Sequence, residues 1–163
     1  MKTNSQGALS SSSICPENSK LGEFSNNVAH SNLKAGLRVY QKLIPRRDPC
    51  RGVFYDTNKP TDPYWYNPII TAFFTDFTSW SNVEHGAIFE QIGDVRLVNF
   101  KVADNLVAGI EISMTQDTIT GNPQIIDALV IGHSSNHDSL TIESELRGII
   151  TPRTDNFYVN GAR

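Results

Sequence analysis

Apolar residues in this chain recur in short strand-like runs, which are separated by asparagine, glycine and serine. The clearest runs cover residues 24–30, 70–80, 95–103 and 124–132, and shorter ones cover 140–142 and 156–159. Alternation of apolar and polar side chains over such short runs predicts β-strands. No long window shows the 3.6-residue period of an amphipathic helix. The pattern therefore predicts an all-β protein.

Three segments, 32–39, 82–89 and 105–112, share one pattern of eight positions. In order, the eight positions are asparagine, an aliphatic residue, any residue, either alanine or histidine, glycine, an apolar residue, any residue and a second apolar residue. Each also follows a strand-like run, so the repeating unit is a strand, an asparagine corner, glycine and a second strand. Asn82 and Asn105 are 23 residues apart, which suits one coil of a β-helix, whereas Asn32 and Asn82 are 50 apart, which fits one coil with an inserted loop, or two coils. The predicted corners carry Asn32, Gly36, Asn82, Gly86, Asn105 and Gly109.

These residue types suit a sharp corner. Asparagine tolerates the left-handed backbone region, and glycine permits a tight bend because it has no Cβ. If the corners stack, the asparagine amides can bond one another along the stack, as amide ladders do in cross-β packing. The repeat therefore predicts a right-handed parallel β-helix. Its inward aliphatic columns are expected to contain Leu37, Val39, Ile88, Ile110 and Ile112.

An antiparallel sandwich is the alternative, because alternating strands with turns also build that fold. The common spacing of asparagine and glycine favours stacked coils. We expect residues 1–13 to be a disordered N-terminal segment and residues 14–163 to be β-helix repeats that are incomplete at both ends. Proline-containing segments at 45–49 and 58–63 are predicted loops that leave the helix body.

Composition and charge narrow the class of protein. Hydrophobic residues make up 39% of the chain and charged residues 19%, as in ordinary folded proteins. The net charge of -3 argues against a nucleic-acid partner, and the cluster of Arg46, Arg47 and Arg51 is too short for a polyanion patch. The polar, serine-rich start has no apolar segment typical of a secretion signal, and no run reaches membrane-spanning length.

Two cysteines, Cys15 and Cys50, flank the first strand region. In an oxidising compartment they can form a disulfide that closes a loop of roughly 36 residues, which stabilises by about 3–4 kcal/mol on the chain-entropy model. Two unpaired buried thiols are the alternative.

The residues also resemble a known family. Segments 21–31, 36–40 and 48–50, with shorter matches at 85–87, 102–105 and 151–155, are similar to the β-helix region of fibrocystin and fibrocystin-L. The resemblance extends from about Ile14 to the end of the chain. It implies a piece of a large, membrane-anchored protein of the cell surface, whose remaining chain is its first partner. More distant relatives act in hyaluronan breakdown, so the resemblance also implies a link to glycans by analogy.

Candidate metal ligands are sparse. Of the four histidines, His30, His85, His133 and His137, only the last two are four residues apart, and no helix is predicted there, so we expect no metal centre built on them. If the coils superimpose, a face of stacked carboxylates would attract Ca²⁺. That face would contain Asp76, Glu84, Asp104 and Asp155, with Arg153 as the candidate base of a glycan-cleaving enzyme. The simpler interpretation is that these charged residues lie on an outer face and keep it soluble.

The densest aromatic stretch is the best candidate for ligand contact. Half of Phe73, Phe74, Phe77 and Trp80 should lie in the core, because most of them alternate with polar residues. The loop carrying Tyr64, Trp65 and Tyr66 is the predicted platform for a glycan or protein, together with Arg153 and Asp155.

No catalytic signature occurs, and no catalytic residue is assigned. The sequence therefore predicts a non-catalytic extracellular scaffold or receptor segment that needs no cofactor. The alternative hypothesis is a fragment of a Ca²⁺-dependent, glycan-cleaving β-helix enzyme.

Overall fold

The computed structural model of the chain describes residues 14–50, 67–115, 123–135 and 146–152, and the backbone of 158–160. These residues form one short 3₁₀ turn, η1 (Pro16–Asn18), and β-strands. Within the described ranges, no helix is long and apolar enough to cross a membrane. The predicted all-β class is therefore confirmed for the described part of the chain.

The strands are short and belong to three groups. The first group contains β1 (Val28–His30), β4 (Thr78–Trp80), β7 (Lys101–Ala103) and β10 (Leu129–Ile131). The second contains β2 (Ala35–Val39), β5 (His85–Ile92), β8 (Ala108–Thr115) and β11 (Arg147–Ile150). The third contains β3 (Ala72–Thr75), β6 (Val95–Val98), β9 (Gln124–Ile126) and β12 (Tyr158–Asn160).

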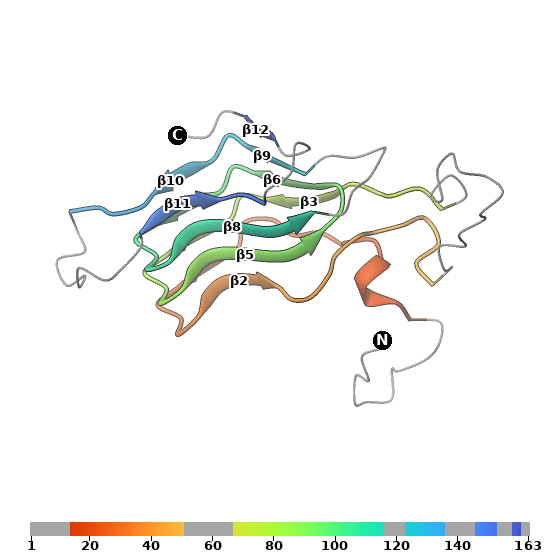
Figure 1. Cartoon of the computed structure of the whole chain (residues 1–163), viewed down its shortest axis with the longest axis horizontal. Helices are drawn as coiled ribbons and strands as arrows, with labels where there is room; N and C mark the ends of the chain where they lie inside the picture. The colour runs from red at the N-terminus through yellow and green to blue at the C-terminus, as the bar shows by residue number, and fades with distance from the viewer. Residues whose placement is uncertain (1–13, 51–66, 116–122, 136–145, 153–157, 161–163) are drawn as a thin grey trace.

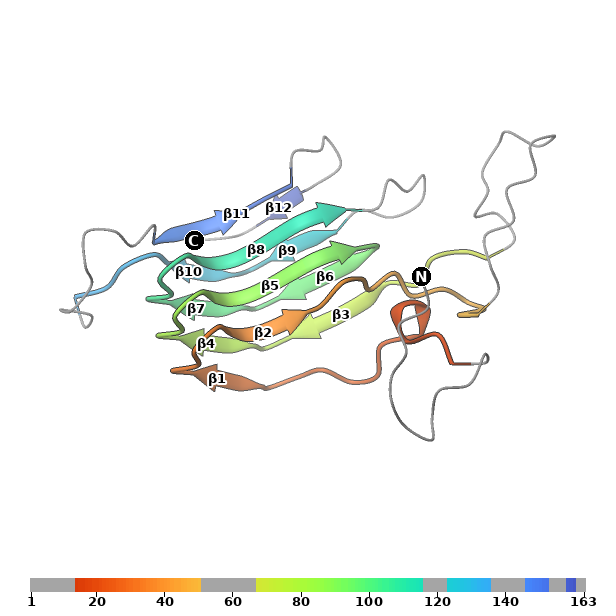
Figure 2. The ribbon, with the colours of Figure 1, turned by 60° about the horizontal axis from the view of Figure 1, so that its bottom comes forward.

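Each group is one four-stranded sheet, and neighbouring strands in each sheet are parallel. The order is β1-β4-β7-β10 in the first sheet, β2-β5-β8-β11 in the second and β3-β6-β9-β12 in the third (Figures 1 and 2). An antiparallel sandwich would pair consecutive strands in opposite directions, so that alternative is wrong. The parallel sheets are consistent with a β-helix-like fold.

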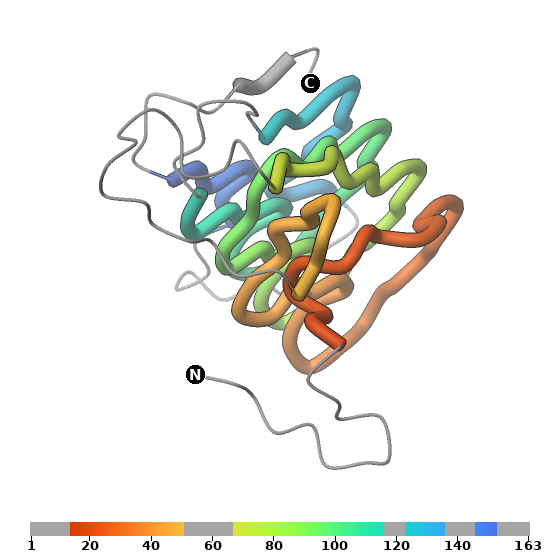
Figure 3. Tube along the Cα trace, turned by 90° about the vertical axis from the view of Figure 1, so that its right-hand side faces the viewer, coloured from red at the N-terminus to blue at the C-terminus, as the bar shows by residue number. Residues whose placement is uncertain are grey.

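Successive passes of the chain lie one above the other, as the colour order of the tube shows (Figure 3). We call one such pass a rung. The second rung contains β3, β4 and β5, the third β6, β7 and β8, and the fourth β9, β10 and β11. Residue i in one rung therefore faces its equivalent in the next, about 4.8 Å away across the ladder.

The core consists of columns of equivalent inward residues. In the second sheet Leu37, Ala87 and Ile110 face one another in register, and Val39 is in register with Phe89. Ala87, Phe89 and Ile110 are fully buried. These inward columns are the ones expected from the sequence, with a single exception.

Ile88 was predicted to point inward, and this is wrong. It is in register with Arg38 and Glu111, which belong to the outward row, and it is only partly buried. Ala87 takes the inward position instead. The repeat itself indicated this outcome, because Ile88 occupies its seventh position, where the other two copies have Arg38 and Glu111.

Aromatic rings fill the core beside the corner that leads from the third sheet to the first. Phe77 and Phe100 are buried, with ring centroids 5.2 Å apart, and Phe24 extends the stack at 5.8 Å from Phe77. Phe74 is also buried, whereas Phe73 and Trp80 are exposed. Two of the four aromatic residues in this run, Phe74 and Phe77, thus lie in the core.

The corners are built by residues with left-handed backbone. At the corner from the third sheet to the first, these are Asn26, Asp76, Asn99 and Asp127, with φ between 52° and 55°. At the corner from the first sheet to the second, they are Ser31, Ser81 and Asp104, with φ between 53° and 56°. Asparagine and aspartate adopt this conformation more readily than other residues with a side chain.

The asparagines of the repeat follow the left-handed residue and have a different role. The side-chain amide of Asn32 donates to Oδ1 of Asn82 at 2.9 Å, and that of Asn82 donates to Oδ1 of Asn105 at 2.8 Å. The amide of Asn105 donates to the backbone oxygen of Ala103. These bonds form a ladder across three rungs, with Asn82 and Asn105 each 1% exposed.

The glycines of the repeat were expected at the tight bends, but they lie inside β2, β5 and β8, where they allow neighbouring rungs to approach. A Cβ on Gly86 would lie 2.5 Å from the backbone oxygen of Gly109. Gly109 has the same relationship with Gly148, where the added Cβ would lie 2.8 Å from the oxygen. Gly148 therefore continues the glycine column into a fourth rung.

A disulfide joins Cys15 to Cys50, with Cα atoms 5.3 Å apart. It holds the segment containing η1 near the point where the chain leaves the first rung. There the backbone N–H of Ile44 donates to the oxygen of Glu17, and that of Arg46 donates to Asn18.

Candidate functional site

The outer face of the first sheet carries two rows of outward side chains. One row contains His30, Trp80, Ala103 and Ile131, and the other contains Val28, Thr78, Lys101 and Leu129. Each row takes one residue from each of β1, β4, β7 and β10, because side chains alternate between the two faces of a strand. The inward residues between the rows include Ser79 and Val102, which are buried.

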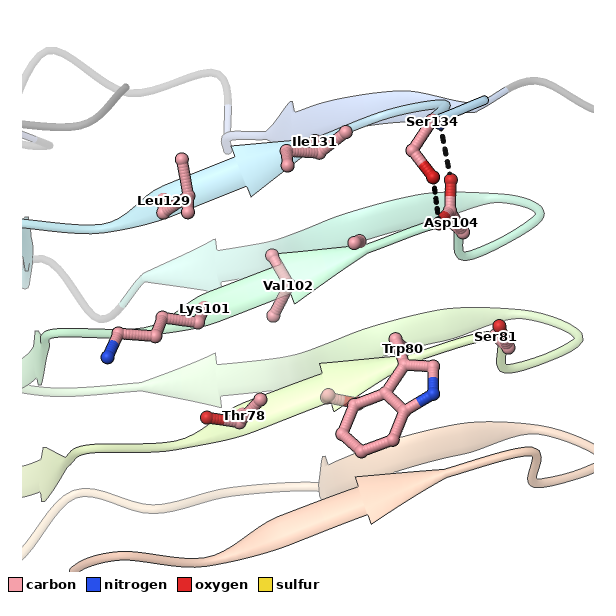
Figure 4. Close-up of a pocket in the computed structure, with 11 residues that line it drawn as sticks. Thr78, Trp80, Ser81, Lys101, Val102, Asp104, Leu129, Ile131 and Ser134 are labelled. Atoms are coloured by element: carbon pink, nitrogen blue, oxygen red, sulfur yellow. Dashed lines mark hydrogen bonds between the residues drawn. The ribbon is translucent and has the colours of Figure 1, made fainter. Parts of the chain in front are cut away.

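A groove of about 520 Å³ crosses the outer face over β4, β7 and β10. Figure 4 shows Trp80 on β4 and Ile131 on β10, on either side of β7. The residue between them in the row is Ala103, whose side chain ends at Cβ. A small residue between two large ones leaves space on the sheet, so Ala103 forms the floor of the groove.

Trp80 is the main aromatic surface of the groove. It is 37% exposed, and its ring stacks on that of His30 with centroids 4.4 Å apart and planes 12° from parallel. Stacking on a neighbouring ring reduces the rotamers that the indole can adopt. The groove is thus lined by an aromatic ring that is already positioned.

One end of the groove is polar and is fixed by hydrogen bonds. Asp104 is only 7% exposed, and both its carboxylate oxygens accept bonds from Ser134. The backbone N–H of Ser134 donates to Oδ1 at 2.6 Å, and its hydroxyl donates to Oδ2 at 2.7 Å (Figure 4). Ser81 also lines this end.

Lys101 lies at the opposite end of the groove from Asp104 (Figure 4). Its neighbours in the outward row are Thr78 and Leu129, which carry no charge. Within the part of the chain that the structure describes, the lysine ammonium forms no ion pair. It is therefore available to an anion that enters the groove.

The second sheet presents a different outer face, on which a cation is already paired. Arg38 donates from Nη2 to Oε1 of Glu90 at 2.6 Å and lies 4.8 Å from the ring centre of Tyr40. The hydrogen bond with Glu90 raises the pKa of the Arg38 guanidinium. Because this pair is satisfied internally, it offers a ligand less than Lys101 does.

The aromatic and charged residues predicted for ligand contact, Tyr64, Trp65, Tyr66, Arg153 and Asp155, lie outside the described residues. The same holds for His137. Their role stays a prediction.

The other histidines have local contacts. His30 stacks on Trp80, and Nε2 of His85 lies 2.7 Å from Oε2 of Glu111. His133 is exposed, next to Gly132 at the end of the fourth strand of the first sheet.

The structure separates two of the predicted acidic residues, Asp76 and Asp104, and Asp155 lies outside the described residues. Asp76 precedes β4, whereas Asp104 follows β7, so the two lie at opposite ends of the first sheet. Asp76 accepts a hydrogen bond from the amide of Asn99 at 2.5 Å, and Asp104 bonds Ser134. Among the described residues, no three His, Cys, Asp or Glu side chains form a group that could hold a metal ion.

Sequence reasoning missed this groove. Its residues come from three strands that are far apart in the chain, and the space depends on the small size of Ala103. The available signal in the sequence was Trp80, an aromatic residue flanked by Ser79 and Ser81. Only the register between rungs places Trp80 and Ile131 in one row, on either side of Ala103.

Comparisons with known proteins give weak similarity to large proteins. The chain is 29% identical over 130 residues to fibrocystin of Canis lupus familiaris, covering 80% of this chain and 3% of that protein. It is 25% identical over 167 residues to fibrocystin-L of Homo sapiens, covering 98% of this chain and 4% of that protein. It is 28% identical over 146 residues to the cell migration-inducing and hyaluronan-binding protein of Mus musculus, covering 81% of this chain and 10% of that protein.

These similarities support the fibrocystin-like resemblance of the sequence. The chain spans a tenth or less of the length of each of these three relatives. No family model and no solved structure matches the chain.

Proposed function

We propose that this chain is a non-catalytic, ligand-binding segment of a large fibrocystin-like protein of the cell surface. In this proposal the three parallel sheets close into a right-handed β-helix, which acts as a rigid scaffold. The stacked rungs, the asparagine ladder and the similarity to fibrocystin and fibrocystin-L support it. The rest of the parent chain is its first partner.

The ligand that suits the groove best is a glycan. Sugar rings have apolar faces that pack on aromatic side chains and hydroxyl groups that bond polar residues at the edge. The groove offers Trp80 as the aromatic surface and Ser81 and Thr78 as hydroxyl partners. One similar protein carries hyaluronan binding in its name, which supports a glycan ligand by analogy.

The observation that carries the proposal is the space at Ala103 between Trp80 and Ile131. The two flanking residues are two rungs apart, or about 10 Å at the usual strand spacing, before the thickness of the side chains is subtracted. A single sugar ring over Ala103 can extend onto the indole, which lies on the β1 side of β4 (Figure 4).

The test is glycan binding by the whole chain, measured by calorimetry with hyaluronan oligosaccharides and with neutral oligosaccharides of equal length. We expect Trp80→Ala to weaken binding about tenfold, which corresponds to the loss of one aromatic stacking contact. Ala103→Leu should block the groove while it leaves the fold intact. Phe73→Ala is the matched control, because Phe73 is an exposed aromatic residue on the third sheet.

Binding that is unaffected by Trp80→Ala and Ala103→Leu, or no binding to any glycan, would contradict the proposal. The same samples should show no shortening of hyaluronan, with or without a chelator, since the proposed segment is non-catalytic. Shortening that a chelator abolishes would instead support the enzymatic hypothesis.

A further inference from the structure

We propose that the groove selects acidic sugars over neutral ones, and that Lys101 is the residue that makes this selection. The inference rests on the proposed glycan-binding function and names the class of glycan. It depends on how the two ionisable groups of the groove are arranged.

Lys101 and Asp104 are the ionisable residues that line the groove. The carboxylate of Asp104 is buried, and both its oxygens accept hydrogen bonds from Ser134. A carboxylate satisfied in this way is shielded from a ligand and repels an anion less than a free one. The charge that a ligand meets is therefore the ammonium of Lys101.

The neighbourhood of Lys101 leaves that ammonium available. Thr78 and Leu129 flank it in the outward row, and neither can neutralise it. The lysine is exposed at the edge of the groove, and its flexible side chain extends away from Asp104 in Figure 4. An exposed ammonium beside an apolar surface gains more from an anion than one in open water, because the apolar wall excludes part of the solvent.

The spacing of the outward positions puts an anionic group of a bound sugar within reach of this side chain. Lys101 and Ala103 are adjacent outward positions of β7, so their Cα atoms lie about 7 Å apart. A ring bound over Ala103 and Trp80 carries its carboxylate as a side substituent, and the flexible lysine stem can reach it. Neutral sugars bound in the same place leave the lysine without a partner.

The experiment compares a matched pair of ligands with the whole chain. One is a hyaluronan oligosaccharide, and the other is the same oligosaccharide with its carboxylates reduced to alcohols. The dissociation constant of each is measured by calorimetry at two salt concentrations, for the unmodified chain and for Lys101→Gln. Lys20→Gln is the control, since Lys20 is an exposed lysine outside the groove.

We expect the acidic oligosaccharide to bind about tenfold more tightly than the reduced one, as for a single charge-assisted hydrogen bond. Lys101→Gln should remove this preference and its salt dependence, and Lys20→Gln should not. Equal binding of the two ligands that Trp80→Ala weakens would overturn the charge selection and leave the proposed function standing. Binding of neither ligand would overturn both.

Discussion

Asn82 and Asn105 lie on consecutive rungs, and one donates its side-chain amide to the side-chain oxygen of the other at 2.8 Å. The same oxygen of Asn105 also accepts the backbone N–H of Asn82 at 3.2 Å. Asn82 in turn accepts both the amide and the backbone N–H of Asn32. One buried asparagine thus satisfies polar groups on the rung below and on the rung above.

Replacing Asn82 should therefore be costly. Asn82→Ala removes the side-chain donor to the buried oxygen of Asn105, which keeps only the backbone N–H of residue 82, and it removes the acceptor used by Asn32. We expect a loss of about 2–4 kcal/mol in the free energy of unfolding, because buried polar groups then lack partners. Urea denaturation followed by circular dichroism measures it.

The matched control is Asn32→Ala at the end of the same ladder. Asn32 is exposed, so water replaces the bonds that are lost, and we expect a cost below about 1 kcal/mol. Equal costs for Asn82→Ala and Asn32→Ala would show that burial of the ladder contributes nothing.

The glycine column gives a second prediction, on backbone approach. In Gly86→Ala the new methyl group would lie 2.5 Å from the oxygen of Gly109 and 2.9 Å from Nδ2 of Asn105. The rungs must separate to accept it, and we expect a destabilisation of about 1–3 kcal/mol. Gly22→Ala should change stability by no more than about 0.5 kcal/mol, since nothing lies within 4 Å of the added atom. A comparison of melting temperatures tests the pair, and similar shifts in both variants would argue against close rung packing.

The disulfide gives a third prediction, which depends on the redox conditions. The bond joins residues 35 positions apart. Replacing both partners in the variant Cys15→Ser, Cys50→Ser should lower the stability by about 3–4 kcal/mol on the chain-entropy model. Reductant should produce a similar shift in the unmodified chain and none in the double variant. If reductant destabilises both proteins equally, the effect does not come from this bond.

His30 provides a fourth prediction, through its contact with Trp80. The two rings stack at 4.4 Å, so His30→Ala removes the surface that restricts the indole. We expect glycan affinity to fall about threefold, which corresponds to part of the 0.5–1.5 kcal/mol typical of an aromatic pair. His30→Phe should restore the affinity, because a phenyl ring can stack in the same place. If His30→Phe binds the glycan as weakly as His30→Ala, the imidazole itself contacts the ligand and the stacking explanation is wrong.

The repeat pattern made the architecture predictable, because Asn32, Asn82 and Asn105 share their surroundings in sequence as well as in space. The parallel direction of the strands followed from stacking these units. The pattern did not extend to Gly148, because it was defined by an asparagine four positions before the glycine and Ser144 stands there. The structure identifies Gly148 by its register with Gly109.

The roles of individual corner residues were less predictable than their positions. Asparagine was expected to supply the left-handed backbone of the repeat corner, yet Ser81 and Asp104 supply it, and Asn82 and Asn105 use their amides for the ladder. Backbone propensity alone does not show which of two adjacent residues adopts the left-handed conformation and which one forms the ladder. The groove depends on which outward residue is small, and the apolar pattern of one strand does not contain that information.

The corner that leads from the second sheet to the third differs greatly in length between rungs. Only Gly93 and Asp94 separate β5 from β6, whereas residues 40–71 separate β2 from β3. Both connections return the chain to the same register, since β3 and β6 pair as regular neighbours. New sequence can therefore enter at this corner without disturbing the columns of the core, which makes it the natural place for evolution, or an engineer, to add a recognition loop.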